Sequence, residues 1–145
     1  VHTAIMNYMD SLIQKKISLD VYNLENYVYI DEKWITFIMC QVLQNSIKYL
    51  NKPEKIIKIH SENNKNNVVL VIEDNGEGIL DHDLPRVFEY GFTGTDRQKQ
   101  YSTGIGLYLC KKLCNKMNLD IKIESQYKKF TKVKIIFPKT NLYRQ

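Results

Sequence analysis

All six glycines of this 145-residue chain lie between positions 76 and 106, as three separated pairs. Glycine allows backbone conformations with positive φ and lets the backbone come close to a bound molecule. Loops of this kind often hold phosphate, because their bare N–H groups donate to phosphate oxygens. The alternative is that the glycines only form turns, but turns elsewhere in the chain use asparagine and lysine. The pattern therefore favours a loop-built site for a phosphate-bearing ligand.

Several well-known catalytic and binding patterns are missing from the sequence. There is no G-x-x-x-x-G-K-[ST], which excludes a P-loop, and the G-x-G at 76–78 continues without the third glycine of a Rossmann fingerprint. There is also no H-E-x-x-H zinc motif and no G-x-S-x-G serine elbow. Cys40, Cys110 and Cys114 lack further metal ligands at matched spacing, so they are predicted to be reduced, buried side chains.

Four short segments contain most of the remaining candidates for chemistry. They are QVLQNSIKY at 41–49, DNGEGI at 74–79, Val87-Phe88, and TGIGL at 103–107. In a helix, the polar side chains of the first segment fall at i, i+4, i+7 and i+8 and share one face. They are Gln41, Asn45, Lys48 and Tyr49. This stripe indicates a binding face, although for Lys48 alone an ordinary solvated lysine is the simpler interpretation.

The periodicity of the apolar residues predicts the elements that position these segments. Helices are expected at 1–14, at 32–50 with Asp31 as N-cap, at 85–88 and at 104–117, with a polar loop at 90–103. Strands are expected at 17–20, 27–30, 55–62, 68–73, 120–125 and 132–137, the last two as a hairpin. No repeat or linker interrupts the chain, so one α+β domain is expected.

The composition is that of a globular domain, with 43% hydrophobic and 26% charged residues. No apolar run approaches the roughly 20 residues that cross a bilayer, so a membrane is expected only through segments outside this chain. The net charge of +5 comes from scattered lysines, which makes nucleic acid a poor prediction for the partner. The apolar side chains of residues 1–14 are expected to have few packing partners within this chain. These residues are therefore expected to continue a helix that begins upstream.

The four segments, in this order, resemble the N, G1, F and G2 boxes of the GHKL ATPase superfamily. Within it, the chain is most similar to the catalytic, ATP-binding domain of bacterial sensor histidine kinases, from about residue 17 to residue 138. Residues 31–34 together with 41–49 further resemble small Firmicute kinases that serve peptide-antibiotic transporters. The resemblance implies the Bergerat fold, a two-layer α+β sandwich in which helices pack on one face of a mixed, mostly antiparallel sheet.

The resemblance also implies roles for the matched residues. Asn45 is expected to offer its side-chain oxygen to Mg²⁺. Lys48 is expected to place its charge at the phosphates. Both residues are expected to be catalytic. Tyr49 is expected to lie against the nucleotide ring. Asp74 is expected to accept a hydrogen bond from the adenine amino group, which favours ATP over GTP, unless it only forms a D-N-G hairpin turn. The other expected nucleotide-binding residues are Gly76, Gly78, Ile79, Phe88, Thr103, Gly104, Ile105, Gly106 and Leu107.

The segment from 91 to 103 is expected to act as a lid over the nucleotide. Arg97 and Lys99 are candidates to reach phosphate, although solvated lid charges explain them at least as well. Phe88 and Phe92 are expected at the hinge of this lid, and a simple core position explains Phe88 equally well. The helix that follows the lid is expected to present bare N–H groups to the polyphosphate. The alternative is that Ser102 or Thr103 only caps this helix start.

Two departures from the family pattern bear on the reaction. Gln41 stands where gyrase- and MutL-type ATPases have a glutamate that activates water. An amide cannot accept a proton at neutral pH, so slow ATP hydrolysis is expected. The histidine that accepts phosphate in the kinases is missing, because none of His2, His60 and His82 has a matching context. That histidine is expected upstream of residue 1.

The resemblance therefore implies an ATP- and Mg²⁺-dependent histidine kinase catalytic domain at 15–145. Residues 1–14 would be the tail of an upstream dimerisation and phosphoacceptor hairpin. The parent protein is expected to be a homodimer in the cell membrane that acts on a response regulator, with this domain in the cytoplasm. The alternatives are an anti-sigma-type serine kinase or another GHKL ATPase on the same fold, and a nucleotide-responsive module without catalysis.

Overall fold

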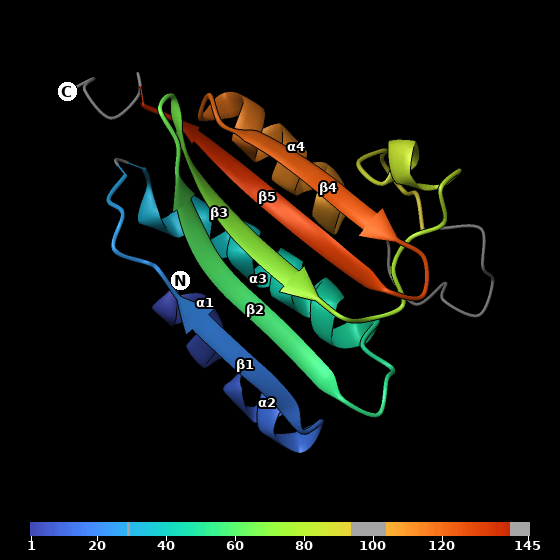
Figure 1. The fold of residues 1–145 in the computed structure, drawn as a ribbon. Coiled ribbons are helices and arrows are strands. Elements are labelled where there is room, and N and C mark those ends of the chain that lie inside the picture. Colours follow the sequence, from blue (N-terminus) through green and yellow to red (C-terminus); the bar gives the residue numbers. More distant parts are fainter. Residues whose placement is uncertain (29, 94–103, 140–145) are drawn as a thin grey trace.

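The computed structural model describes residues 1–28, 30–93 and 104–139, which form a five-stranded sheet with helices on one face (Figure 1). The strands are β1 (Ile17–Tyr22), β2 (Lys55–Asn63), β3 (Asn67–Asp74), β4 (Asp120–Gln126) and β5 (Phe130–Pro138), in the order β1-β2-β3-β5-β4. The helices are α1 (His2–Asn7), α2 (Met9–Gln14), α3 (Glu32–Lys48) and α4 (Gly106–Lys116), with a 3-10 turn η1 at Leu84–Arg86. β1 pairs with β2 in parallel, and the other strand pairs are antiparallel. The predicted two-layer α+β sandwich is confirmed.

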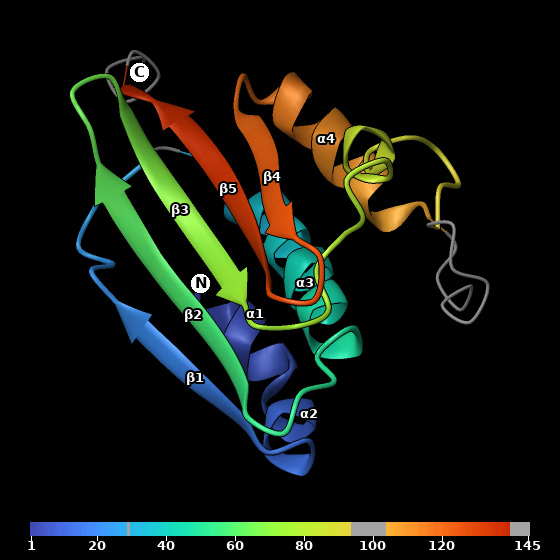
Figure 2. The ribbon, with the colours of Figure 1, turned by 45° about the vertical axis from the view of Figure 1, so that its right-hand side comes forward.

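The core lies between the sheet and the helix layer, which Figure 2 shows on a single side of the strands. Fully buried side chains from both layers meet there: Ile57, Ile59, Ile72 and Ile135 from the sheet, and Ile38, Met39, Leu43, Cys110 and Cys114 from α3 and α4. The prediction of buried thiols holds for Cys110 and Cys114, whereas Cys40 is half-buried. Burial raises the pKa of the Cys110 thiol to about 12, so this thiol stays protonated.

Helix α3 begins where the sequence predicts. Asp31 Oδ1 accepts a hydrogen bond of 2.9 Å from Lys33 N, which satisfies one of the free N–H groups of the first turn. The helix ends at Lys48 rather than at the predicted residue 50, and the carbonyl oxygen of Tyr49 accepts a bond of 3.1 Å from Glu77 N. That bond fastens the end of α3 to the loop that follows β3.

The strand predicted at 27–30 is wrong, because the described residues of that range lie in an irregular segment. Here the chain leaves the sheet edge at β1 and has to reach α3 in the other layer. Side chains anchor the segment in place of a strand ladder: Asn26 Nδ2 donates to Ser61 Oγ at 2.7 Å, and Asn63 Nδ2 donates to Asn26 Oδ1 at 3.0 Å. The helix predicted at 85–88 is the 3-10 turn η1, and the helix predicted from 104 begins at Gly106.

Residues 1–14 pack on the domain more closely than predicted. They form α1 and α2, separated at Tyr8, and Ala4, Ile5 and Leu12 belong to the core. The expectation that this stripe would find little to pack on is wrong, because α1 lies against α3 and α2 lies against β1. A domain boundary at residue 14 stays a prediction. None of the helices in the described part of the chain has the length and apolar character of a membrane span.

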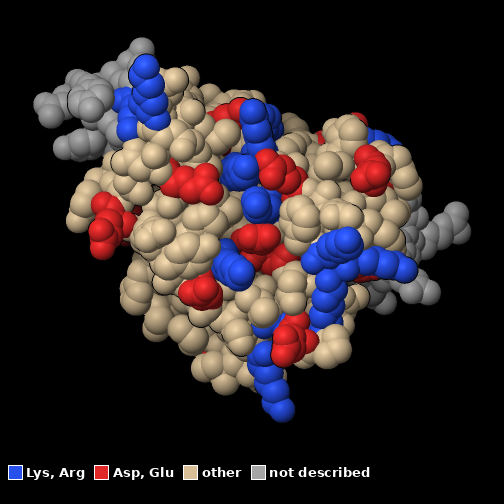
Figure 3. Space-filling view, viewed as in Figure 1, with Lys and Arg blue, Asp and Glu red and all other residues tan. Residues whose placement is uncertain are grey.

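No helix of the described residues covers the other face of the sheet, which has charges of both signs across its strands (Figure 3). The ladder places Glu73 between Lys58 and Lys132, and Lys134 Nζ lies 2.8 Å from Glu124 Oε1. Opposite charges on neighbouring strands support the pairing of those strands. On this face the lysines are therefore interleaved with acidic residues rather than gathered in one basic stripe.

Candidate functional site

A cavity of about 600 Å³ opens where α3, the end of β3, the β4–β5 hairpin and the start of α4 meet. Of the predicted site residues, those that line it are Asn45, Lys48, Tyr49, Asp74, Gly78, Ile79, Gly104, Gly106 and Leu107. Gly76, Phe88 and Ile105 do not line it, and Thr103, Arg97 and Lys99 lie outside the described residues. With Val87 also in its wall, the cavity brings together all four segments that the sequence singled out.

The polar stripe of α3 forms one wall of the cavity. Gln41, Asn45, Lys48 and Tyr49 all line it and are all half-buried. Lys48 Nζ lies 5.5 Å from the centre of the Tyr49 ring. This wall therefore offers an ammonium group and amide oxygens, which are suited to an anionic ligand and to a hard cation bound with it.

Asp74 ends β3 at the bottom of the cavity and is only 5% exposed. Its Oδ1 accepts a hydrogen bond of 2.9 Å from Gly76 N. Burial raises the pKa of the Asp74 carboxyl to about 6, against the opposing effects of the Gly76 N–H and the Ser46 hydroxyl. The D-N-G segment forms no hairpin, because the strand that pairs with the end of β3 is β5. The bond from Gly76 N shows that Asp74 nevertheless also has the turn-forming contact that the alternative implied. A buried carboxylate at this place is suited to accept from a neutral N–H donor of a ligand.

Gly78 has a structural reason to be glycine. Its φ is +74°, in the region that side chains rarely adopt, and a Cβ atom there would collide with the carbonyl oxygen of Gln126. The loop after β3 therefore packs backbone against backbone on the turn between β4 and β5. This backbone contact fixes the position of the loop after β3 relative to the β4–β5 hairpin.

Replacing Gly78 with alanine is expected to lower the free energy of unfolding by about 2–4 kcal/mol, from left-handed strain plus overpacking. Gly91 is the matched control, because its φ is +75° but no atom of the described residues lies within 4 Å of the Cβ position. Gly91→Ala is expected to cost only about 1–2 kcal/mol, from the strain alone. Urea denaturation of both variants measures the difference, and equal losses would contradict the packing role of Gly78.

Helix α4 begins beside the cavity without a side-chain cap at its N-cap residue Ile105. Gly104, with φ +70°, lies against the backbone of Gly91, whose N–H donates to the Gly104 carbonyl oxygen at 3.1 Å. Gln41 Oε1 reaches across from α3 to the position that a Cβ atom on Gly106 would occupy. The N–H groups of the first turn and the helix dipole favour an anion at this end of the cavity.

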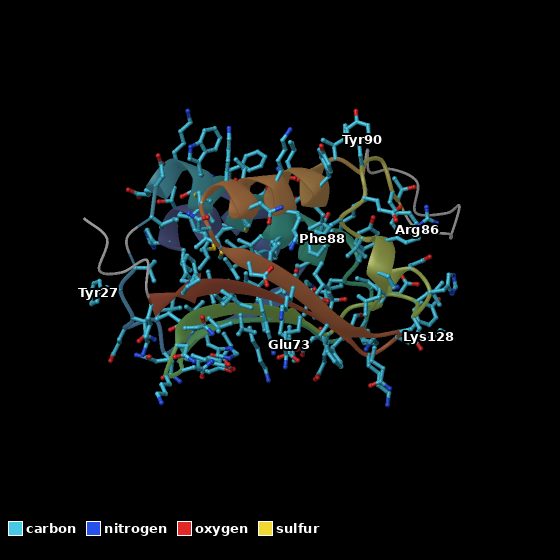
Figure 4. The ribbon with its side chains drawn as sticks, turned by 90° about the horizontal axis from the view of Figure 1, so that it is seen from above. Tyr27, Glu73, Arg86, Phe88, Tyr90 and Lys128 are labelled. Atoms are coloured by element: carbon cyan, nitrogen blue, oxygen red, sulfur yellow. The ribbon has the colours of Figure 1, made fainter. Side chains whose placement is uncertain are left out.

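The two phenylalanines expected at the hinge have different surroundings. Phe88 packs against the core and lies below α4 in Figure 4. The Nζ atom of Lys111 lies 5.7 Å from the centre of the Phe88 ring. The structure therefore agrees with the core position that the sequence left open for Phe88. Phe92 lines the cavity, and the Arg86 guanidinium carbon lies 4.5 Å from its ring centre.

Several residues of the cavity wall were not predicted as site residues. They are Val42, Gln44, Ser46, Leu80, Asp83, Thr93, Ile123, Tyr127, Thr131 and Val133. Thr131 lies directly across from Asp74 in the β3–β5 ladder. The register of two strands so far apart in sequence is set by packing and cannot be read from local pattern. Ser46 could have been predicted as a site residue, because it follows Asn45 on the helix that faces the site.

Comparison with known families decides what kind of domain contains this cavity. The model of the family described as "Histidine kinase-, DNA gyrase B-, and HSP90-like ATPase" matches residues 30–141. The chain belongs to this ATPase family. The matched range contains every wall of the cavity, from the polar stripe of α3 to the hairpin of β4 and β5.

Individual relatives of this ATPase domain are sensor kinases. The sensor protein kinase GraS of Staphylococcus aureus strain JH1 is 40% identical over 129 residues, which cover 88% of this chain and 37% of the relative. The GraS of strain MRSA252 is 38% identical over the same length. The chain thus spans little more than a third of the length of these relatives.

Solved structures share the fold of this ATPase domain. A mycobacterial sensor histidine kinase, MprB, superposes with a TM-score of 0.79 at 20% identity and covers 94% of both chains. The catalytic domain of the histidine kinase ThkA, in a nucleotide-free form, gives a TM-score of 0.78 at 20% identity, covering 95% of this chain and 90% of its own. At such identities the likeness concerns the fold alone.

None of the three histidines lines the cavity of this ATPase domain. His2 begins α1 and is exposed. His60 lies in β2, stacked on Tyr22 with ring centres 4.8 Å apart. His82 follows the loop after β3, with its Nε2 3.4 Å from Asp83 Oδ1. His2 and His82 are thus exposed surface residues, as expected, whereas His60 is half-buried and not the ordinary surface residue that was expected.

Proposed function

We propose that this chain is the ATP-binding catalytic domain of a sensor histidine kinase, which donates the γ-phosphoryl group of ATP to a histidine on a separate domain. One observation supports this proposal above the others: a buried carboxylate and the start of helix α4, whose N-cap residue Ile105 provides no side-chain cap, line the same cavity, with the polar face of α3 also in its wall. The family and the sensor-kinase relatives agree with it. The small Firmicute antibiotic-sensing type, suggested by sequence, fits the staphylococcal relatives.

The nucleoside is proposed to lie at the Asp74 end of the cavity. The adenine amino group would donate to the carboxylate, and Ile79 and Tyr49 provide apolar surface for the ring. Guanine has a carbonyl oxygen where adenine has the amino group, so two acceptors would face each other. An unpaired buried acceptor costs about 1–3 kcal/mol, which gives the preference for ATP over GTP.

The phosphates are proposed to lie between the start of α4 and the Lys48 ammonium group. Asn45 offers an amide oxygen on the same wall, which fits Mg²⁺, a cation that takes oxygen ligands from protein, phosphate and water. When bound, Mg²⁺ would supply charge neutralisation of the phosphates. Lys48 and the α4 N–H groups would orient the γ-phosphoryl group for in-line attack by a nucleophile from outside the chain.

Gln41→Glu is expected to raise ATP hydrolysis by at least about tenfold, because a general base contributes 10²–10⁴-fold and an amide provides none. Gln41 lines the cavity and reaches the start of α4, where an attacking water would be activated. Gln44→Glu is the matched control, since it adds the same charge to another residue of the α3 wall. Phosphate release is the measurement, and an equal response of both variants would contradict a special position for Gln41.

Nucleotide affinity is expected to fall below neutral pH through Asp74. Burial raises the pKa of this carboxyl to about 6, so it is mostly ionised at pH 7 and mostly protonated at pH 5. The protonated form is the weaker acceptor, so adenosine is expected to bind about tenfold more weakly at pH 5 than at pH 7. Adenosine is used because it has no phosphate that titrates in this range. Asp74→Asn should flatten the profile, and a pH-independent affinity in the wild type would refute the prediction.

The proposed reaction is tested by incubating the chain with Mg·ATP labelled in the γ-phosphate and the histidine-bearing hairpin of its parent protein, supplied separately. Transfer of an acid-labile, base-stable label is expected, as for phosphohistidine. An acid-stable label on a serine-bearing partner would favour the anti-sigma-type kinase. Nucleotide binding without transfer to either partner would favour the non-catalytic module. A dimeric parent, a response regulator as final acceptor, and a cytoplasmic position beside the membrane are parts of the same proposal.

A further inference from the structure

The turn between β4 and β5 lies beside the loop that follows β3, as both Figure 1 and Figure 2 show. Residues 127–129 form this turn, because Gln126 and Phe130 are the last pair of the β4–β5 ladder. Its first residue, Tyr127, lines the cavity together with Asp74 and Ile79. Tyr127 thus lines the same cavity as the proposed contact to the nucleobase.

The hydroxyl group of Ser125, near the end of β4, joins the β4–β5 hairpin to the loop after β3. Ser125 Oγ accepts a hydrogen bond of 2.8 Å from Ile79 N and donates one of 2.7 Å to the carbonyl oxygen of Phe130. It also lies 3.3 Å from Thr131 Oγ1. Ser125 therefore links β4, β5 and a cavity-lining residue of the loop at one point.

Two further hydrogen bonds, one from the backbone and one from a side chain, fix the turn against its neighbours. Lys128 N donates to the carbonyl oxygen of Glu77, and Lys52 Nζ donates to the carbonyl oxygen of Lys129 at 3.1 Å. Lys128 has a φ of 65°, a conformation that non-glycine residues rarely adopt and that neighbouring structure has to maintain. The loop after β3 and the Lys52 side chain thus hold this turn beside the cavity.

We propose that Tyr127 contacts the nucleoside part of bound ATP and that Ser125 is the positioning residue that keeps the turn in place for this contact. The proposal rests on the proposed function, because it assigns Tyr127 to the nucleoside end of the same cavity. An aromatic ring binds any nucleobase through its face, so Tyr127 adds affinity while Asp74 provides the selection for adenine.

The first test compares Tyr127→Ala and Tyr127→Phe by calorimetric titration with adenosine, ADP and Mg·ATP. Tyr127→Ala is expected to weaken all three by a similar factor of about five- to a hundredfold, because the lost contact is to the part that they share. Tyr127→Phe keeps the ring and is expected to stay within about twofold of the wild type. Tyr27→Ala is the matched control, since this ring is 91% exposed and lies at the opposite end of the molecule from Lys128 in Figure 4.

The second test concerns Ser125. Ser125→Ala is expected to weaken adenosine and Mg·ATP by the same factor of about three- to tenfold, the worth of one hydrogen bond, and Ser125→Thr is expected to restore both affinities. A purely structural serine would lower the unfolding temperature and leave both affinities unchanged, which would overturn its positioning role.

The outcomes separate this proposal from the proposed function. Unchanged adenosine affinity in Tyr127→Ala, with normal binding by the wild type, would overturn only the assignment of Tyr127. A loss for Mg·ATP but not for adenosine would also overturn it, because the ring would then act at the phosphates. Absence of nucleotide binding by the wild type would instead refute the proposed function.

Discussion

Replacing Asp74 with alanine is expected to weaken Mg·ATP binding by about ten- to a hundredfold. The lost interaction is a hydrogen bond to a charged, buried group, which is worth about 1.5–3 kcal/mol, and each 1.4 kcal/mol changes the dissociation constant tenfold. The alanine variant is also expected to lose its discrimination between ATP and GTP, because the acceptor that rejects guanine is gone. Calorimetric titration with both nucleotides measures the two effects.

The neighbouring acidic residue provides the matched control. Glu73 lies on the same strand but on the helix-free side of the sheet, away from the cavity (Figure 4), so Glu73→Ala is expected to keep wild-type affinity. Because burial raises the pKa of Asp74, its ionised carboxylate destabilises the empty domain at neutral pH. Asp74→Ala removes this charge but also the acceptor of the Gly76 N–H. The two effects oppose each other, so its unfolding temperature is expected to stay close to that of the wild type. A variant that loses binding because it is unfolded would contradict this account.

Asn45→Ala is expected to lower phosphoryl transfer by about 10²–10³-fold, the effect of removing one preorganised electrostatic contact at the reacting group. The amide oxygen of Asn45 is the proposed protein ligand of Mg²⁺, so its loss leaves the cation poorly placed relative to the γ-phosphate. ATP binding should also lose most of its dependence on Mg²⁺. The measurements are the rate of label transfer and the ATP affinity with and without the cation.

An exposed asparagine on another helix serves as the control for Asn45. Asn115 lies on α4 and is not part of the cavity wall, so Asn115→Ala is expected to transfer phosphate at the wild-type rate. Full Mg²⁺ dependence in Asn45→Ala would mean that the cation is held by other groups. That result would remove Asn45 from the proposed catalytic residues and leave the role of Asp74 untouched.

The helix-based part of the site was predictable because helix geometry converts sequence spacing into a shared face. Asn45 and Lys48 are three residues apart on α3, and both line the cavity. Asp31 as N-cap and Asp74 at the end of a buried strand were likewise local signals. In each case, the information lies within a few residues of the position concerned.

The hairpin side of the site was not predictable, because it depends on contacts between distant segments. Thr131 comes to face Asp74 through the β3–β5 register, and Tyr127 reaches the cavity through a turn fixed by the loop after β3. The packing of residues 1–14 was not predictable for the same reason. Their apolar side chains pack against α3, which is distant in sequence and is brought near only by the fold. The glycine-rich window indicated a ligand, whereas Gly78 is required by the neighbouring backbone.

A crystal structure of the chain with Mg²⁺ and a non-hydrolysable ATP analogue tests the central claim most directly. The account predicts the adenine amino group within hydrogen-bond distance of the Asp74 carboxylate, the phosphates at the start of α4, and the cation at the amide oxygen of Asn45. An analogue bound outside this cavity, or bound with its base at α4 and its phosphates at Asp74, would contradict the account.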